Sequence, residues 1–153
     1  MNILENLMPF FNHGQKTTKK DKNYTKKTYE VSELFESKDG VGKFGEQLAK
    51  KYYGQLGYKF IESNFNKRMG EIDLIFQYSG CYIFCEVKTR TSRMFGEAIE
   101  SLTAKKMRRI LRMIQYYSLL HRIPGDRVRA DFIAIQIDSG TATLEHFANI
   151  ELA

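Results

Sequence analysis

Apolar and polar positions follow one another along the chain in a pattern that predicts a mixed α/β domain starting near Gly40. Apolar residues recur at helical spacing over residues 42–57, and a longer apolar stripe runs from Thr103 to His121. Short runs rich in β-branched and aromatic residues predict strands at 58–65, 71–78, 81–89, 128–137 and 141–148. The order is then α-β-β-β-α-β-β, which indicates an α/β (α+β) fold, a mixed sheet with helices packed on it.

Two local features refine this picture. Only Ser79-Gly80 separates the strands 71–78 and 81–89, so these strands predict a hairpin with a two-residue turn. The run 141–148 is expected at an edge of the sheet. In the helix at 42–57, Gly42 and Gly45 are costly, and a close approach to the backbone is one reason to keep glycine there.

The first part of the chain has a different composition. The stretch 12–30 is rich in Lys, Thr and Asn and nearly devoid of aliphatic residues. Such a segment cannot bury enough surface to offset its ordering entropy. We therefore expect a basic, disordered N-terminal extension over 1–39 and one folded domain over 40–153.

The charge balance favours a polyanionic partner. The chain carries 24 Lys and Arg against 18 Asp and Glu, a net charge of +6. Residues 88–112 are the most basic stretch, dense enough for a phosphate-binding surface, although a solvated helix face is the alternative. Two cysteines make no disulfide framework, no apolar run reaches the length of a membrane span, and the first residues lack a secretory pattern. We therefore expect a cytoplasmic protein with no membrane partner.

Two acidic positions stand out on the predicted hairpin. Asp73 lies six residues before the turn and Glu86 six residues after it, so the two carboxylates are expected nearly opposite each other. Carboxylates so close repel unless a proton or cation lies between them, and Mg²⁺ is the typical cation of phosphate chemistry. Strand alternation places Lys88 on the same face as Glu86. The alternatives are a surface Glu–Lys pair and a strand-end carboxylate that limits edge pairing.

Two further acids have both a structural and a functional interpretation. Glu46 lies in the first turn of the first predicted helix, where an acid also favours the helix dipole. Asp131, on the strand 128–137, is either a further site acid or the structural partner of Arg129 or Arg127.

Several short motifs carry a resemblance over about residues 40–150. The chain resembles the bacterial YraN family of predicted endonucleases, which is similar to archaeal Holliday-junction resolvases within the PD-(D/E)XK nuclease-like superfamily. The motifs, in chain order, are Gly42-x-x-Gly45-Glu46, Gly57-Tyr58, Asn64, Gly70-Glu71-Ile72-Asp73-Leu74-Ile75, Glu86-Val87-Lys88-Thr89-Arg90, Phe95-Gly96 and Lys105-Lys106.

The resemblance implies an endonuclease that uses Mg²⁺ or Mn²⁺ to hydrolyse phosphodiester bonds of DNA, with branched or structured DNA as the expected substrate. It implies that Asp73, Glu86 and the carbonyl of Val87 hold the metal and that Glu46 completes the metal site. Lys88 would position and activate the attacking water. The superfamily's proline before the aspartate is replaced here by Ile72.

The expected nucleic-acid surface surrounds these residues. A resolvase-like activity needs two active sites, so the analogy also implies a homodimer. The competing hypothesis is a non-catalytic nucleic-acid-binding module that uses the same basic surface. For Arg68 and Arg90, which flank the site, solvated surface charge is an equal alternative. The candidate nucleic-acid-binding residues are Arg68, Arg90, Lys105, Lys106, Arg108, Arg109 and Arg112.

Overall fold

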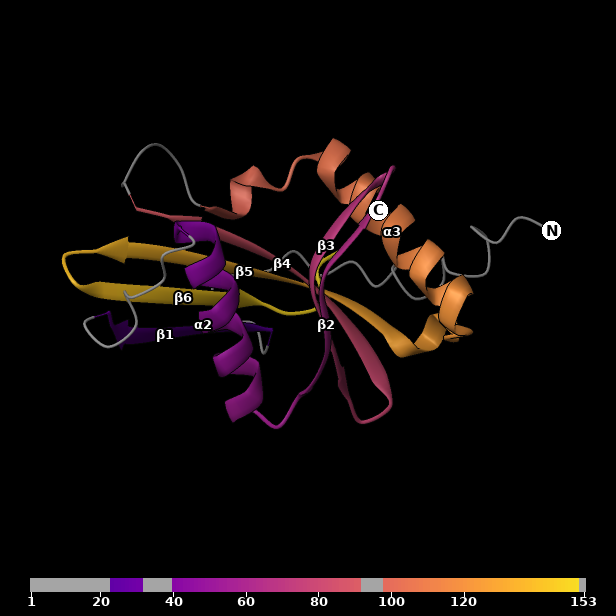
Figure 1. The fold of residues 1–153 in the computed structure, drawn as a ribbon, viewed down its shortest axis with the longest axis horizontal. Helices are drawn as coiled ribbons and strands as arrows, with labels where there is room; N and C mark the ends of the chain where they lie inside the picture. The colour runs from indigo at the N-terminus through magenta and orange to yellow at the C-terminus, as the bar shows by residue number, and fades with distance from the viewer. Residues whose placement is uncertain (1–22, 32–39, 92–97, 152–153) are drawn as a thin grey trace.

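The computed structural model describes residues 23–31, 40–91 and 98–151 (Figure 1). No helix in these ranges is long and apolar enough to cross a membrane. The strands are β1 (Tyr24–Glu30), β2 (Lys59–Lys67), β3 (Gly70–Tyr78), β4 (Cys81–Arg90), β5 (Val128–Asp138) and β6 (Thr141–Phe147). The α-helices are α2 (Val41–Gln55) and α3 (Ala104–His121), and short 3-10 turns lie at η2 (Ala98–Ser101) and η3 (Gly125–Arg127).

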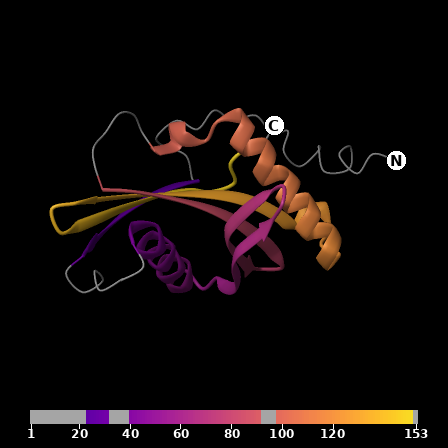
Figure 2. The ribbon, with the colours of Figure 1, turned by 45° about the horizontal axis from the view of Figure 1, so that its top comes forward.

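The strands form one mixed sheet in the order β1-β6-β5-β4-β3-β2. The pair β4–β5 is parallel and the other neighbouring pairs are antiparallel. A parallel pair needs a long crossover, and α3 lies in the connection between β4 and β5. Figure 2 shows α2 on one face of the sheet and α3 on the other. The expected mixed sheet with packed helices is therefore confirmed.

Strand alternation divides the core into two layers. On β4, Ile83 and Cys85 pack with α2, whereas Phe84 between them packs with α3. The α2 layer contains the helix residues Phe44, Leu48, Ala49, Tyr52 and Tyr53, and the α3 layer contains Ile110, Met113, Ile114 and Tyr117. Successive side chains of a strand point to opposite faces, so one apolar strand serves both layers.

The helix α2 lies close to β4 at Gly45. A Cβ on Gly45 would overlap the hydroxyl of Thr89 and lie 2.9 Å from its Cβ, so rotation of the Thr89 side chain would not clear the space. Nothing lies within 4 Å of a Cβ placed on Gly42. The close approach to the helix backbone expected at these two glycines therefore occurs at Gly45, where the neighbour is the Thr89 side chain, and not at Gly42.

The strand β1 was not anticipated. Residues 24–30 fall within the stretch expected to be disordered, yet they pair with β6 from Tyr24↔Phe147 to Glu30↔Thr141. An edge strand gains backbone hydrogen bonds from its neighbour without needing aliphatic side chains, and its polar face remains in water. The strand β6 is consequently an inner strand, which corrects its expected place at an edge. Residues 1–22 and 32–39 of the expected extension lie outside the described residues.

Candidate functional site

Asp73 lies where the sheet opens between β3 and β4. Regular pairing of these strands ends at Leu74↔Cys85, so Asp73 and Glu86 occupy the next position on each strand. Asp73 Oδ2 accepts a hydrogen bond of 2.8 Å from the backbone N–H of Val87. On the neighbouring strand β2, Asn64 adopts a left-handed φ of 53°, which asparagine tolerates better than most residues. The Asp73 carboxylate therefore accepts the hydrogen bond that a backbone carbonyl of β3 would accept from β4 in a regular ladder.

The surroundings of Asp73 disfavour its charge. Burial raises the pKa of Asp73 to about 7, and the nearby Glu86 carboxylate contributes to this shift in the same direction. The Val87 N–H opposes the shift, while Glu46 and Glu71 raise the pKa further. Glu46 reaches this region from α2, where it is half-buried. The fold thus gathers several carboxylates around Asp73 with little positive charge to balance Asp73 itself.

A cleft of about 610 Å³ opens above these acids. The acids on its surface are Glu71, Asp73 and Glu86, and its other charged lining residues are basic. The β2–β3 turn rests on α3, since a Cβ on Gly70 would lie 3.2 Å from Met113 Cγ. The remaining lining residues are Asn66, Lys67, Arg68, Gly70, Thr103, Lys105, Lys106, Arg109 and Ile110.

An ion pair joins the two walls of the cleft. Lys106 Nζ lies 2.5 Å from Glu86 Oε1, and the Glu86 side chain is only 12% exposed. The start of α3 fixes the position of this lysine, because the Thr103 side chain caps the helix by accepting the backbone N–H of Lys106 at 3.2 Å.

The structure brings six of the twelve sequence-predicted residues into the cleft, and Glu46 and Val87 are among those that do not line it. Asp73, Glu86, Arg68, Lys105, Lys106 and Arg109 line the cleft. Lys88 is exposed and lies two residues beyond Glu86 on β4, and its side chain does not line the cleft. Neither do Arg90, Arg108 and Arg112.

The sequence reasoning missed four polar cleft residues, namely Asn66, Lys67, Glu71 and Thr103. The signal for Glu71 was present, because it precedes Asp73 by two residues and so shares its strand face.

The donor set fits a hard divalent cation that keeps part of its water shell. Among the described residues, no three His, Cys, Asp or Glu side chains form a metal-binding group. Asp73 and Glu86 offer carboxylate oxygens on the surface of the cleft, and the resemblance adds the Val87 carbonyl as a third oxygen donor. Mg²⁺ is commonly held by one or two carboxylates together with water, so this small oxygen set suits it.

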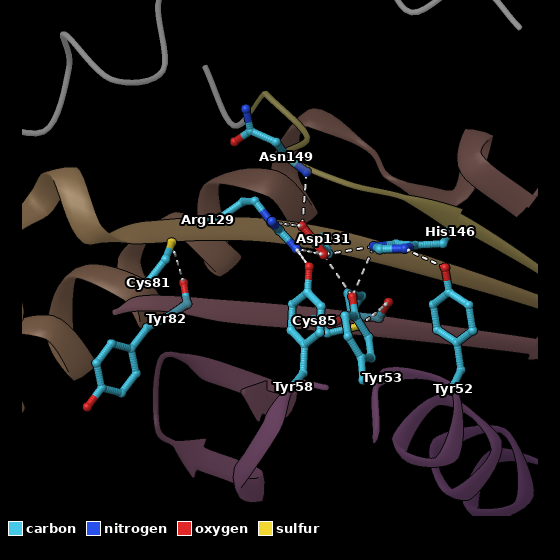
Figure 3. A network of polar contacts seen from close by, with 11 residues as sticks. Tyr52, Tyr53, Tyr58, Cys81, Tyr82, Cys85, Arg129, Asp131, His146 and Asn149 are labelled. Atoms are coloured by element: carbon cyan, nitrogen blue, oxygen red, sulfur yellow. Dashed lines mark hydrogen bonds and ion pairs between the residues drawn. The ribbon is translucent and has the colours of Figure 1, made fainter. Parts of the chain in front are cut away.

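Asp131 lies outside the cleft, in a buried polar network on the α2 side (Figure 3). It is 1% exposed and forms bonds of 2.8 and 2.9 Å with the Arg129 guanidinium. Tyr53 donates its hydroxyl to Asp131 Oδ2 at 2.8 Å, and His146 Nε2 lies 2.8 Å from the same oxygen. Of the two interpretations of Asp131, the structure supports that of a partner to Arg129.

The network compensates the buried charge of Asp131. Burial opposes its ionisation, but the hydrogen bonds from His146 and Arg129 outweigh burial and hold the pKa of Asp131 at about 2. Tyr53 belongs to α2, and His146 belongs to β6. The network therefore ties α2 to the centre of the sheet, opposite the α3 layer.

Comparison with known proteins identifies the family of the chain. Residues 45–135, which include Glu46, Asp73, Glu86, Lys88 and Lys106, match the family described as "Uncharacterised protein family UPF0102". A UPF0102 protein of Herpetosiphon aurantiacus is 38% identical over 125 residues, covering 78% of this chain and 99% of the relative. A UPF0102 protein of Kineococcus radiotolerans is 36% identical, covering 74% and 95% of the two chains. A third, from Persephonella marina, is 40% identical and covers 61% and 81%. The YraN-type resemblance is thus confirmed at the level of the family, and the chain belongs to UPF0102.

Proposed function

We propose that the protein is a Mg²⁺-dependent endonuclease of the PD-(D/E)XK type that hydrolyses phosphodiester bonds of DNA. One observation carries the proposal: Asp73 and Glu86 meet at the opening of the sheet, in a cleft that Arg68, Lys106 and Arg109 also line. Acids that can hold a cation and bases that can hold phosphate are the two requirements of metal-assisted phosphodiester hydrolysis.

Each residue has a role in this proposal. Asp73, Glu86 and the Val87 carbonyl would hold the cation, with Glu46 completing the site directly or through water. When bound, the cation supplies Lewis-acid stabilisation of the phosphate and a water that ionises near neutral pH. Lys88 orients the attacking water and stabilises developing negative charge, which requires its exposed side chain to turn toward Glu86 when substrate is present.

The basic wall positions the substrate. Arg68 lies at the β2–β3 turn, and Lys105 and Arg109 lie on the first turns of α3, so phosphates on either side of the scissile bond would meet cations. Because Lys and Arg side chains make up this surface and would bind phosphates, the proposal favours recognition of DNA shape, including branched DNA, over recognition of sequence. A homodimer would supply the two sites that symmetric cleavage of a junction requires.

A cleavage panel tests the proposal. Duplex, flap and four-way DNA are incubated with Mg²⁺, with Mn²⁺ and with EDTA, using wild-type protein, Asp73→Ala and Lys88→Ala. Lys51→Ala, an exposed lysine on α2 outside the cleft, is the matched control for loss of one positive charge. We expect metal-dependent cleavage by the wild type and the control, and a loss of at least about 100-fold in the two site variants.

The outcomes separate the candidate functions. Undiminished cleavage by both site variants would overturn the catalytic assignment. Metal-independent binding without cleavage of any substrate would favour the non-catalytic nucleic-acid-binding module.

A further inference from the structure

The ion pair between Lys106 and Glu86 connects the acidic and basic parts of the cleft. We propose that Lys106 is the counter-ion of Glu86 until a divalent cation binds, and that it then turns to a phosphate of the nucleic acid. Lys106 would thereby couple cation binding to nucleic-acid binding. This inference rests on the proposed function, because it requires both ligands to bind in the same cleft.

Glu86 needs a positively charged partner when no cation is bound. Its side chain is 12% exposed and lies beside the buried Asp73, so an ionised Glu86 without a partner would be unfavourable. Lys106 Nζ, 2.5 Å from Glu86 Oε1, provides the positive charge that this carboxylate requires. The lysine therefore satisfies the acid that a cation would otherwise satisfy.

A divalent cation and the Lys106 ammonium would compete for Glu86. A divalent cation held by Asp73 and Glu86 would share a carboxylate with the Lys106 ammonium and repel it at short range. Lys106 is on a flexible stem and its side chain is 35% exposed, so the ammonium can leave while its backbone stays fixed by the Thr103 cap. Cation binding in the absence of nucleic acid is thus opposed by Lys106.

Once released from Glu86, Lys106 can bind a phosphate in the same cleft. Lys106 lines the same cleft as Lys105, Arg68 and Arg109, where phosphate is expected to bind. A bound cation frees Lys106 for phosphate, and a bound phosphate draws Lys106 away from Glu86. By linkage, each ligand must then raise the affinity for the other by the same factor.

Cation titration tests the competition. Mg²⁺ and Mn²⁺ are titrated into wild-type protein, Lys106→Met and Lys105→Met by isothermal calorimetry, without nucleic acid. Lys105→Met is the matched control, because it removes the same charge from the same helical turn and cleft but has no described ion pair to Glu86. We expect Lys106→Met to bind the cation about fivefold more tightly than the wild type and Lys105→Met to change affinity less than about twofold. Lys106→Arg keeps the charge and should bind as the wild type does.

Coupling is measured with DNA of fixed sequence. The affinity for a fluorescent duplex or four-way junction is determined in EDTA and in Ca²⁺, whose use limits turnover during the titration. Ca²⁺ should tighten DNA binding by wild-type protein and by Lys105→Met. It should have a much smaller effect on Lys106→Met, with all variants folded at the assay temperature in EDTA.

The results distinguish this inference from the proposed function. If wild-type protein binds the cation and DNA but Lys106→Met and Lys105→Met behave alike, Lys106 has no special role and the inference is overturned while the proposed function stands. Weaker cation binding by Lys106→Met would also overturn it, since the lysine would then support the site rather than compete for it. If the wild type binds neither ligand, both proposals fail.

Discussion

Replacing Asp73 by asparagine should make the protein more stable while removing its proposed activity. The native carboxylate is buried beside Glu86, and its pKa is raised from 3.8 to about 7. Ionised Asp73 therefore opposes folding. Asparagine is nearly isosteric, carries no charge, and presents an oxygen that can still accept the Val87 N–H.

The size and pH dependence of this effect follow from linkage. At about 1.4 kcal/mol per pH unit, the difference between 3.8 and about 7 sets a ceiling of about 4 kcal/mol at alkaline pH. Solvent in the open cleft screens part of this destabilisation. We therefore expect Asp73→Asn to raise the free energy of unfolding by about 2 kcal/mol, which corresponds to a rise of about 6 °C in the unfolding temperature. Between pH 4 and 7 the native state holds a proton that the unfolded state has lost, so wild-type stability falls as pH rises through this window.

The assay is thermal and urea unfolding in EDTA, at several pH values from 4 to 8.5. The advantage of Asp73→Asn over the wild type should be largest at pH 8.5 and disappear near pH 4. Glu71→Gln is the control, because Glu71 lines the same cleft but is exposed, so its replacement should change stability less. Added Mg²⁺ should stabilise the wild type more than Asp73→Asn. An unfolding temperature of Asp73→Asn equal to or below that of the wild type at pH 8.5 would refute the argument.

Three further predictions concern the scaffold. Gly45→Ala should lower the free energy of unfolding by about 1–3 kcal/mol, because the added Cβ would overlap Thr89. Gly42→Ala in the same helix should raise the free energy of unfolding by about 0.5–1 kcal/mol, because nothing lies near its Cβ. Urea titration of both variants distinguishes the effect of packing from that of helix propensity. Asp131 should contribute about 2.5 kcal/mol to the free energy of unfolding at pH values above its ordinary pKa of 3.8, and this contribution is lost as pH falls to about 2. The stability of Asp131→Asn should therefore depend less steeply on pH in that window, even though the variant is less stable than the wild type at pH 7. Deleting residues 1–31 removes β1 and uncovers the edge of β6, so the unfolding temperature should drop by several degrees; an unchanged temperature would mean that β1 adds nothing to the sheet.

The arrangement of Asp73 and Glu86 was predictable because it depends on local geometry. A two-residue turn at Ser79-Gly80 fixes the register of the hairpin, and the register then brings the two acids to adjacent positions. This inference requires no knowledge of how distant elements pack. The contact between Gly45 and Thr89 is different, because it joins α2 to β4, and the sequence indicated only that glycine in a helix is costly.

The features that could not be predicted depend on packing between distant segments. Whether Lys106 or its neighbour Lys105 reaches Glu86 depends on the rotation of α3 over the sheet, which the basic composition of the helix does not specify. Similarly, β1 has the composition of a disordered segment, and it becomes a strand because β6 offers an edge to it. Tertiary contacts, not intrinsic propensity, decide such elements.

Comparison of two aspartates on neighbouring parts of the sheet strengthens the assignment of the site. Asp131 receives hydrogen bonds from Arg129, Tyr53 and the Asn149 backbone N–H, and its pKa is about 2. Asp73 is also largely enclosed, but its described hydrogen bond comes from one backbone N–H, its neighbours are acids, and its pKa is about 7. A buried acid that serves only the fold gains stability from full compensation, as Asp131 does. Incomplete compensation at Asp73 lowers stability, and the proposed cation would supply the positive charge that this carboxylate lacks.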